Sequence, residues 1–83
     1  MFIPSPKAIA VHLKDVRIQQ KRSQTDLSEW TGLRQATISD FERSPDKSQL
    51  GTLFKLLGEL QLELHITQIG GDPRIAENSD LDW

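Results

Sequence analysis

Short polar side chains follow one another near the middle of the sequence, in the run RQATIS. Arg34 can reach a phosphate or the O6 and N7 atoms of guanine, and Gln35 can make two hydrogen bonds to adenine N6 and N7. Ala36 can place its methyl group against that of thymine, while Thr37 and Ser39 can contact phosphates or base edges. These side chains have the chemistry that reads the major groove of DNA, although ordinary solvated helix residues are the simpler alternative.

Two short helices joined by a tight turn are predicted to position these side chains. Ser23 and Asp26 have the spacing of a capping box, which predicts a helix start. Gly32 stands where a glycine can end a helix with φ > 0 at little cost. In the next helix, Ile38 and Phe41 lie three residues apart on the inner face. A short helix, a glycine turn and a helix with a small polar outer face form the helix-turn-helix arrangement, whose second helix reads DNA.

The stretch SQTDLSEWTGLRQATISDFER resembles the phage-repressor-like (XRE/Cro-like) helix-turn-helix family. The positions that match the pattern of that family are Gln24, Leu27, Gly32, Ile38, Ser39 and Phe41-Glu42. The run RQATISDFE, the loop SPDKS, a hydrophobic strand and a C-terminal Trp are similar to HipB-type antitoxins, over nearly the whole chain. This resemblance implies the antitoxin of a type II toxin–antitoxin module: a dimeric autorepressor that binds palindromic operator DNA and neutralises a HipA-type Ser/Thr kinase toxin.

The resemblance also implies roles for three residues outside the RQATIS run. Gln24 opens the first helix of the motif, where the family uses glutamine to contact a phosphate, and exposed amides at a helix start favour an anion. Arg17 and Glu42 match positions at which the family joins its first helix to the end of the recognition helix by an ion pair. Such a structural pair would fix the recognition helix, and removing one partner of a buried pair is strongly destabilising.

Residues around the end of the recognition helix give further candidates for DNA contact. Lys47 and Ser48, in the loop after that helix, can contact phosphates. Asp40 differs from the other candidates, because its carboxylate repels phosphate and can only accept hydrogen bonds, for example from cytosine N4. Asp40 either restricts specificity or weakens binding, and the sequence leaves both alternatives open.

The composition is that of one small domain. The chain has 83 residues and no cysteine, which excludes a disulfide and a thiolate metal site. Residues 7–47 carry eight basic and six acidic side chains, a net of +2, whereas residues 48–83 carry two and six, a net of −4. This distribution makes nucleic-acid binding possible without requiring it. A chain this short buries only ~60% of its unfolded surface, so dimerisation is the expected supplement.

No enzyme, cofactor, metal site or membrane segment is expected. His12 is predicted on the surface of a helix and His65 on the solvent side of a strand, without the spacing of a metalloprotease or a Ser-His-Asp triad. The N-terminus MFIPSPK lacks a charged n-region and a long apolar run, so neither a signal peptide nor a membrane span is predicted. A cytoplasmic protein that joins the nucleoid through operator DNA is expected.

Two further helices are predicted on either side of the motif. The first covers residues 6–21, is capped by Ser5, and has an inner stripe of Ile9, Leu13 and Val16. Val11 and Ile18 fall on a second face of that helix, which either meets a partner chain or is simply exposed. The second covers residues 49–60, is capped by Ser48, and has a buried stripe of Leu50, Leu53, Phe54 and Leu57.

Residues 60–69 alternate between apolar and polar types, which predicts a half-buried strand. A lone strand leaves its backbone donors and acceptors unpaired, so pairing with the same strand of a second copy is expected. The side chains expected to form this dimer contact are Leu60, Leu62, Leu64 and Ile66. The predicted fold is therefore mainly α: a four-helix-plus helix-turn-helix domain over residues 1–69, with one C-terminal β-strand pairing across a homodimer.

Residues 70–83 are predicted to form a flexible acidic tail. Trp30, Leu81 and Trp83 are the candidate toxin-binding residues, since Trp is enriched in binding hot spots. The alternatives are that Trp30 packs over a neighbouring loop and that the tail is a frayed end. Two other functions stay open: a stand-alone helix-turn-helix regulator without a toxin partner, and a protein-interaction adaptor without a DNA role.

Overall fold

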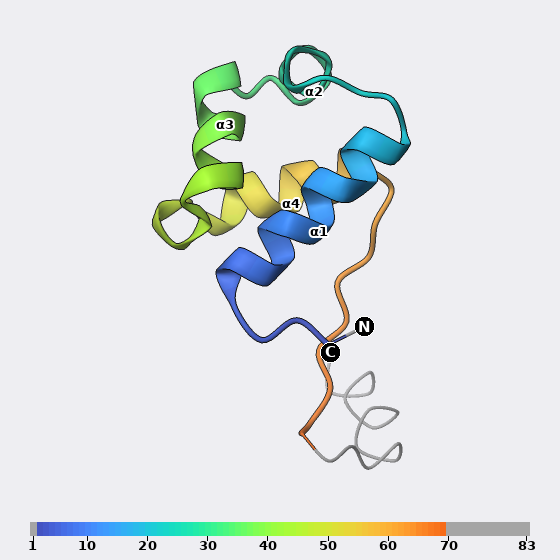
Figure 1. Ribbon diagram of the computed structural model, residues 1–83, viewed down its shortest axis with the longest axis vertical. Helices are drawn as coiled ribbons and strands as arrows, with labels where there is room; N and C mark the ends of the chain where they lie inside the picture. Colours follow the sequence, from blue (N-terminus) through green and yellow to red (C-terminus); the bar gives the residue numbers. More distant parts are fainter. Residues whose placement is uncertain (1, 70–83) are drawn as a thin grey trace.

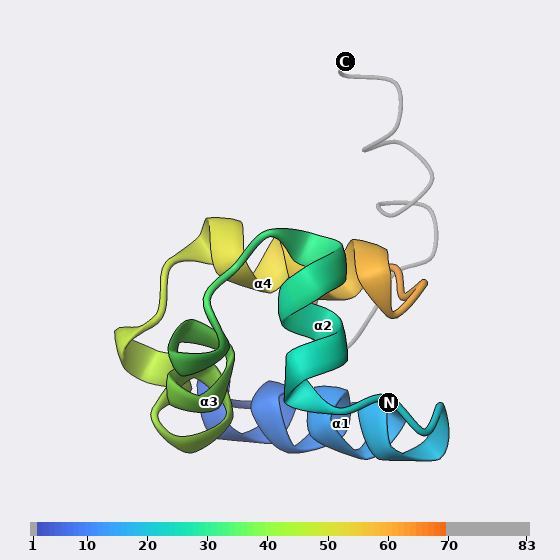
Figure 2. The same ribbon diagram turned by 90° about the horizontal axis from the view of Figure 1, so that it is seen from above.

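The computed structural model describes residues 2–69, which form four α-helices and one short 3-10 helix. The helices are α1 (Pro6–Gln19), α2 (Gln24–Thr31), α3 (Gln35–Arg43), η1 (Pro45–Lys47) and α4 (Leu50–Glu59). Figure 1 shows α2 and α3 together at one end, over α1 and α4. Seen from above, α1 and α4 run along opposite sides with α2 between them (Figure 2). The expected mainly α fold with a helix-turn-helix is confirmed.

One apolar core holds the helices together. Its buried members come from every α-helix and from the residue after α4: Ala10, Leu13, Leu27, Ile38, Phe41, Leu56, Leu57 and Leu60. Fully burying one Leu, Ile or Phe side chain contributes roughly 1.5–3 kcal/mol. Because Ile38 and Phe41 lie in this core, α3 is held against α1, α2 and α4 by its inner face.

Helix α1 begins where the sequence predicts. The Ser5 hydroxyl accepts a hydrogen bond from the backbone N–H of Ala8 at 3.2 Å, and Pro6 occupies the first helical position. The helix ends at Gln19, two residues before the predicted end, because Lys21 takes a left-handed backbone with a φ of 58°. The second face of α1, marked by Val11 and Ile18, is exposed.

The predicted buried face of α4 is correct at Leu57, which is buried, and at Leu53, which packs against the core, and it is wrong at the other two positions. Leu50 and Phe54 are 71% and 55% exposed, whereas Leu56 and Leu57 are buried. The helix is apolar around most of its circumference, so the spacing i, i+3, i+4, i+7 fits the residues from Leu50 and also those from Leu53. Packing against α2 and α3 selects the second set, and the sequence pattern alone cannot choose between them.

The predicted cap of α4 is also wrong. Gln49 takes the N-cap position and makes no side-chain cap hydrogen bond. Ser48 instead ends η1, where its backbone N–H donates to the Pro45 carbonyl oxygen at 3.0 Å. The stretch that is predicted to be a loop contains the short helix η1, and Ser48 caps the end of η1 instead of the start of α4.

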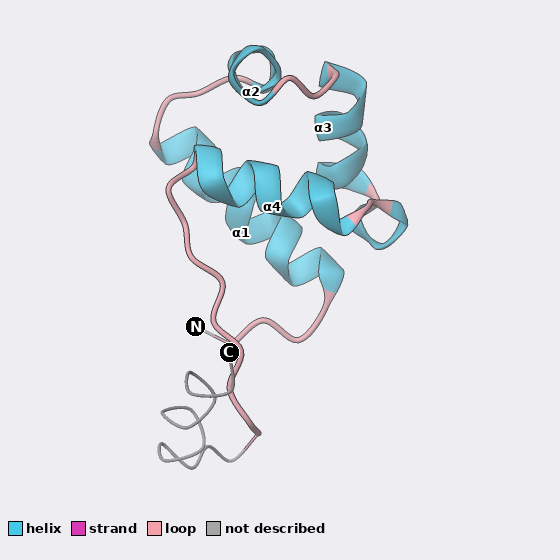
Figure 3. Cartoon of the chain, turned by 180° about the vertical axis from the view of Figure 1, so that it is seen from behind, coloured by secondary structure: helices cyan, strands magenta, loops and turns pink. Residues whose placement is uncertain are grey.

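The segment after α4 differs from the strand expected over residues 60–69. Leu60 is the C-cap residue of α4 and is only 2% exposed, so it belongs to the monomer core. Gln61 has a φ of 60°, and the Leu62 N–H donates back to the Leu57 carbonyl at 2.8 Å, which is a Schellman ending. Figure 3 shows the chain from there to residue 69 as a loop. Within residues 2–69 the predicted strand is not formed.

Two further expectations concern the limits of the domain. Within the described residues, no helix is long and apolar enough to cross a bilayer. The predicted tail, with Leu81 and Trp83, lies outside the described residues. The division of the chain at residue 69 therefore stays a prediction.

Candidate nucleic-acid interface

The start of α2 is fixed by a reciprocal cap. The Ser23 hydroxyl accepts from the Asp26 N–H at 3.0 Å, and the Asp26 carboxylate accepts from the Ser23 N–H at 2.9 Å. This is the capping box that the sequence predicts. The hydrogen bond from the Ser23 backbone, and then that from its side chain, hold the pKa of Asp26 below its usual value. The ionised carboxylate is therefore the form that caps α2.

The turn between α2 and α3 combines a left-handed glycine with side-chain hydrogen bonds. Gly32 has a φ of 77°, and its N–H donates to the Ser28 carbonyl at 3.0 Å. A Cβ at this position would meet no atom within 4 Å, so the requirement for glycine comes from the backbone conformation. The Thr31 hydroxyl donates to the Leu27 carbonyl at 2.6 Å and accepts from the Leu33 N–H at 3.1 Å. These bonds set the angle at which the chain enters α3.

The predicted reading residues lie at the start and along the outer side of α3. Arg34 is the N-cap residue, makes no side-chain cap hydrogen bond, and is exposed. Gln35 and Ala36 are exposed as well. Thr37 and Ser39 are only half-buried rather than fully outward, because each is next to the buried Ile38. The start of α3 thus presents a guanidinium group, a carboxamide and a methyl group to solvent.

A buried ion pair joins α1 to the end of α3. Arg17 Nε donates to Glu42 Oε2 at 2.8 Å and Arg17 Nη2 donates to Oε1 at 3.1 Å, with side chains only 11% and 8% exposed. The third nitrogen, Nη1, donates to the Arg22 carbonyl at 2.9 Å. The pair implied by the resemblance is present, and it also ties down the loop before α2.

Gln24 joins the same carboxylate from α2. Its Nε2 donates to Glu42 Oε1 at 2.8 Å, and its side chain is half-buried. A carboxylate only accepts, so this contact sets the amide with its nitrogen toward Glu42 and leaves one N–H for another acceptor. Sequence reasoning gave Gln24 a phosphate role and missed this bond, since no local spacing indicates a contact between residues so far apart in the chain.

The remaining candidates lie beyond the first turn of α3. Lys47, in η1, is exposed, and Ser48 is half-buried. Asp40 is exposed on α3, where its Oδ1 accepts from Arg43 Nη2 at 2.8 Å. Arg43 was missed as a candidate, although its spacing of three residues from Asp40 on a helix could have indicated the pair.

Known helix-turn-helix proteins match this chain over most of its length. The family model described as helix-turn-helix matches residues 13–66. Antitoxin HipB of Escherichia coli O6:H1 (strain CFT073) is 40% identical over 82 residues, which cover 98% of this chain and 87% of the relative. Antitoxin HipB of Escherichia coli K12 is 38% identical over 82 residues, covering 98% and 93%. The chain belongs to the HipB family of helix-turn-helix antitoxins.

Solved HipB structures share the fold. A structure titled HipB-O4 20mer complex has a TM-score of 0.79 and 40% identity, and covers 82% of this chain and 96% of that chain. A structure titled Structure of HipA-HipB-O2-O3 complex gives the same TM-score and identity, with the same coverage. The two titles describe complexes of those proteins, one with HipB and O4 and one that includes HipA.

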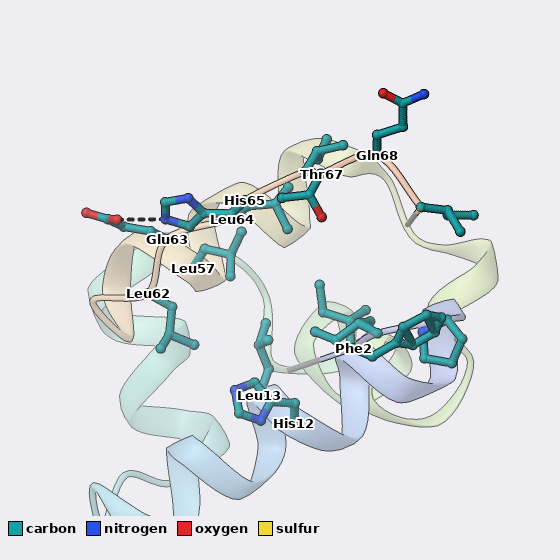
Figure 4. Close-up of a pocket in the computed structure, with 15 residues that line it drawn as sticks. Phe2, His12, Leu13, Leu57, Leu62, Glu63, Leu64, His65, Thr67 and Gln68 are labelled. Atoms are coloured by element: carbon teal, nitrogen blue, oxygen red, sulfur yellow. Dashed lines mark hydrogen bonds and ion pairs between the residues drawn. The ribbon is translucent and has the colours of Figure 1, made fainter. Parts of the chain in front are cut away.

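This HipB-family chain also has an open apolar groove away from α3. The N-terminal arm, α1, α4 and residues 62–69 line it, with Phe2, Ile9, Leu13, Leu57 and Leu64 among its apolar side chains. Figure 4 shows the segment that follows Leu62 along one side of the groove, opposite the side chains of α1. One of these is His12, which is half-buried here rather than on the open surface of the helix.

The other predicted contact residues are divided between surface and core. Trp30 is 69% exposed on α2 and does not pack over a loop to any large extent. Leu62 is half-buried against the core, whereas Leu64 and Ile66 are 42% and 89% exposed. His65 is exposed and its Nε2 lies 3.0 Å from Glu63 Oε2. Among residues 2–69, no group of three or more His, Cys, Asp or Glu side chains is placed to hold a metal ion.

Proposed function

We propose that this chain is the antitoxin of a type II toxin–antitoxin module. It binds palindromic operator DNA as a homodimer, represses its own operon, and binds and neutralises a HipA-type Ser/Thr kinase toxin. The observation that carries the proposal is the exposed start of α3, held in place by a carboxylate that α1 and α2 share. Membership in the HipB family, and solved relatives whose titles name HipA and operator complexes, support the choice of partners.

DNA reading is assigned to the first turns of α3. Arg34 contacts guanine or a phosphate, Gln35 contacts adenine, and Ala36 contacts a thymine methyl group. The half-buried Thr37 and Ser39 contribute contacts at the edge of this face. The side chains assigned to phosphate contact are Gln24, Lys47 and Ser48, and Asp40 also faces the DNA.

Dimerisation is assigned to the segment after α4. Within residues 2–69, the backbone groups of residues 63–69 make no backbone hydrogen bond, and these residues line one side of the groove. Pairing with the same segment of a second copy satisfies these groups and covers Leu62, Leu64 and Ile66. The two recognition helices then enter successive major grooves about 34 Å apart.

Toxin binding is assigned to exposed tryptophan. Trp30 presents a large aromatic side chain on the outside of α2, where the described part of the chain gives it no packing role that requires its size. Leu81 and Trp83 are assigned as a second anchor, at the end of the acidic tail. An antitoxin of this kind acts by binding, without a catalytic centre, in the cytoplasm where its operator lies.

The DNA part of the proposal is tested with a duplex that carries the promoter region of the chain's own gene. Fluorescence anisotropy at two salt concentrations should show tight binding that weakens as salt rises. Gln35→Ala should lose about 1–3 kcal/mol of discrimination at one base position. Lys47→Ala should weaken binding to all sequences and lower the salt slope by ~1. Binding that is equally weak on promoter and unrelated duplexes would refute the proposal.

The toxin part is tested by co-purification with the product of the adjacent gene, using the full chain, Trp30→Ala and a chain that lacks residues 80–83. A kinase-like protein should be retained by the full chain and lost, wholly or in part, with each variant. Unchanged promoter binding by both variants is the control for folding. An adjacent product that is not retained by the full chain favours a stand-alone regulator instead.

A further inference from the structure

The outward side of α3 carries two opposite charges in its C-terminal half. Ala36, Asp40 and Arg43 are spaced by four and three positions, are all exposed, and lie along one line of the helix. Ile38 and Phe41 occupy the opposite, buried side. Asp40 and Arg43 therefore share the face that enters the groove in the proposed complex.

The contact between these two side chains leaves each of them with unused bonding capacity. Arg43 Nη2 lies 2.8 Å from Asp40 Oδ1, and the side chains are 73% and 65% exposed. Asp40 Oδ2 has no hydrogen-bond partner among the described residues. Arg43 uses one of its five N–H donors, so it can bind a phosphate without leaving Asp40.

The chemistry of Asp40 gives it a narrow choice of bases. A carboxylate accepts hydrogen bonds, whereas thymine O4 and guanine O6 and N7 are themselves acceptors and repel it. Adenine has an N6 donor beside its N7 acceptor, so a carboxylate there is attracted and repelled together. Cytosine presents its N4 donor in the major groove without such an acceptor, which makes it the favoured partner.

We propose that Asp40 determines specificity by accepting a hydrogen bond from cytosine N4 in each operator half-site, and that Arg43 positions Asp40. Arg43 holds one carboxylate oxygen, turns the other toward the base, and offsets the repulsion between Asp40 and nearby phosphates. This inference rests on the proposed DNA-binding function. It gives the acidic side chain on the recognition helix a role in base recognition, and it adds Arg43 to the residues that face DNA.

The test is selection from a library of duplexes based on the promoter region, with each half-site position randomised in turn. The unaltered protein should prefer cytosine at one position on the order of tenfold over thymine. Asp40→Asn should reduce this preference to less than about twofold at that position and leave the others unchanged. Arg43→Ala should reduce the same preference and also weaken binding to every sequence. Lys47→Ala, the matched control, should weaken binding to every sequence without changing any preference.

A double-variant comparison separates positioning from a simple phosphate contact. Arg43→Ala should cost clearly more affinity in the presence of Asp40 than in an Asp40→Asn background, because only the first leaves a carboxylate unshielded. All variants should keep their thermal unfolding midpoint, since the pair is exposed.

Three results would overturn the proposal in distinguishable ways. If the unaltered protein binds its promoter and Asp40→Asn selects the same half-site, the role of Asp40 is refuted and the proposed function stands. If Arg43→Ala lowers affinity uniformly and additively, the positioning role is refuted. If the unaltered protein does not bind its promoter, the proposed function fails together with this inference.

Discussion

Arg17 of α1 and Glu42 of α3 form a two-point ion pair, at 2.8 and 3.1 Å, with both side chains nearly buried. Gln24 of α2 donates to the same carboxylate at 2.8 Å. One acidic side chain therefore fixes three helices relative to one another at the level of the recognition helix.

Arg17→Met should strongly destabilise the protein. The substitution leaves Glu42 buried with Gln24 as its remaining side-chain donor, and such a loss costs about 3–5 kcal/mol. Arg43→Ala, which removes the exposed pair with Asp40, should cost less than ~1 kcal/mol. Urea unfolding of both variants at one protein concentration measures the difference, and equal costs would show that the buried pair contributes nothing special.

Replacing two glycines by alanine should change stability in opposite directions. Gly32 has a φ of 77°, so Gly32→Ala should destabilise the protein, by about 1–2 kcal/mol. Gly58 lies inside α4, where alanine is the better helix former, so Gly58→Ala should stabilise it by ~1 kcal/mol. A Cβ at either position meets no atom within 4 Å, so crowding does not contribute. Thermal unfolding midpoints that move in the same direction would contradict the argument.

The cap of α2 should make stability depend on pH through Asp26. Because hydrogen bonds from Ser23 lower the pKa of Asp26 in the folded chain, its contribution is present above the usual value of 3.8 and is lost as pH falls through the lower folded value. Asp26→Asn should therefore be less stable than the unaltered protein at neutral pH, with a difference that shrinks in acid. Ser23→Ala keeps the backbone N–H of residue 23, so this variant should retain more of the pH dependence than Asp26→Asn does. A difference between Asp26→Asn and the unaltered protein that is constant from pH 7 to strong acid would contradict this view.

Ile66→Asp should separate dimerisation from folding. Ile66 is 89% exposed in the single chain, so a charge there leaves the monomer core intact. In the proposed dimer the same charge lies in a covered apolar surface, where an unpaired carboxylate is very costly. Sedimentation should show monomers, with unchanged helix content and weak promoter binding. Trp30→Ala, the control, alters an exposed side chain that is assigned to toxin binding and not to the dimer contact, so this variant should remain dimeric.

The sequence was sufficient for the parts of the fold that local chemistry determines. Ser5, the Ser23–Asp26 box and Gly32 mark helix ends by their own hydrogen bonds and backbone preferences, and all three are found where the pattern predicts. Ile38 and Phe41 are buried because polar neighbours leave α3 only one apolar side. Local signals therefore predicted the helix-turn-helix correctly.

The errors lie where the outcome depends on distant contacts. Two apolar stripes of α4 satisfy the same spacing, and only packing against α2 and α3 leaves Leu50 and Phe54 exposed. The sequence predicts Leu60 both at the end of the last helix and at the start of the strand, because an alternating run begins there, whereas in the fold Leu60 is the C-cap residue of α4 and lies in the core. The bond from Gln24 to Glu42 likewise arises from the tertiary fold, and no spacing in the sequence reveals it.

The Schellman ending of α4 has a consequence for the operator. Leu60 is anchored in the core and Gln61 turns the backbone, so the segment that begins at Leu62 leaves the domain in a direction fixed by the fold. In the proposed dimer this makes the two-fold axis rigid with respect to each recognition helix. One base pair inserted between the half-sites rotates one of them by roughly 35° about the DNA axis. The proposed dimer has no flexible linker between its two recognition helices that would accommodate this rotation. Binding should therefore depend on the distance between the half-sites as strongly as it depends on their bases.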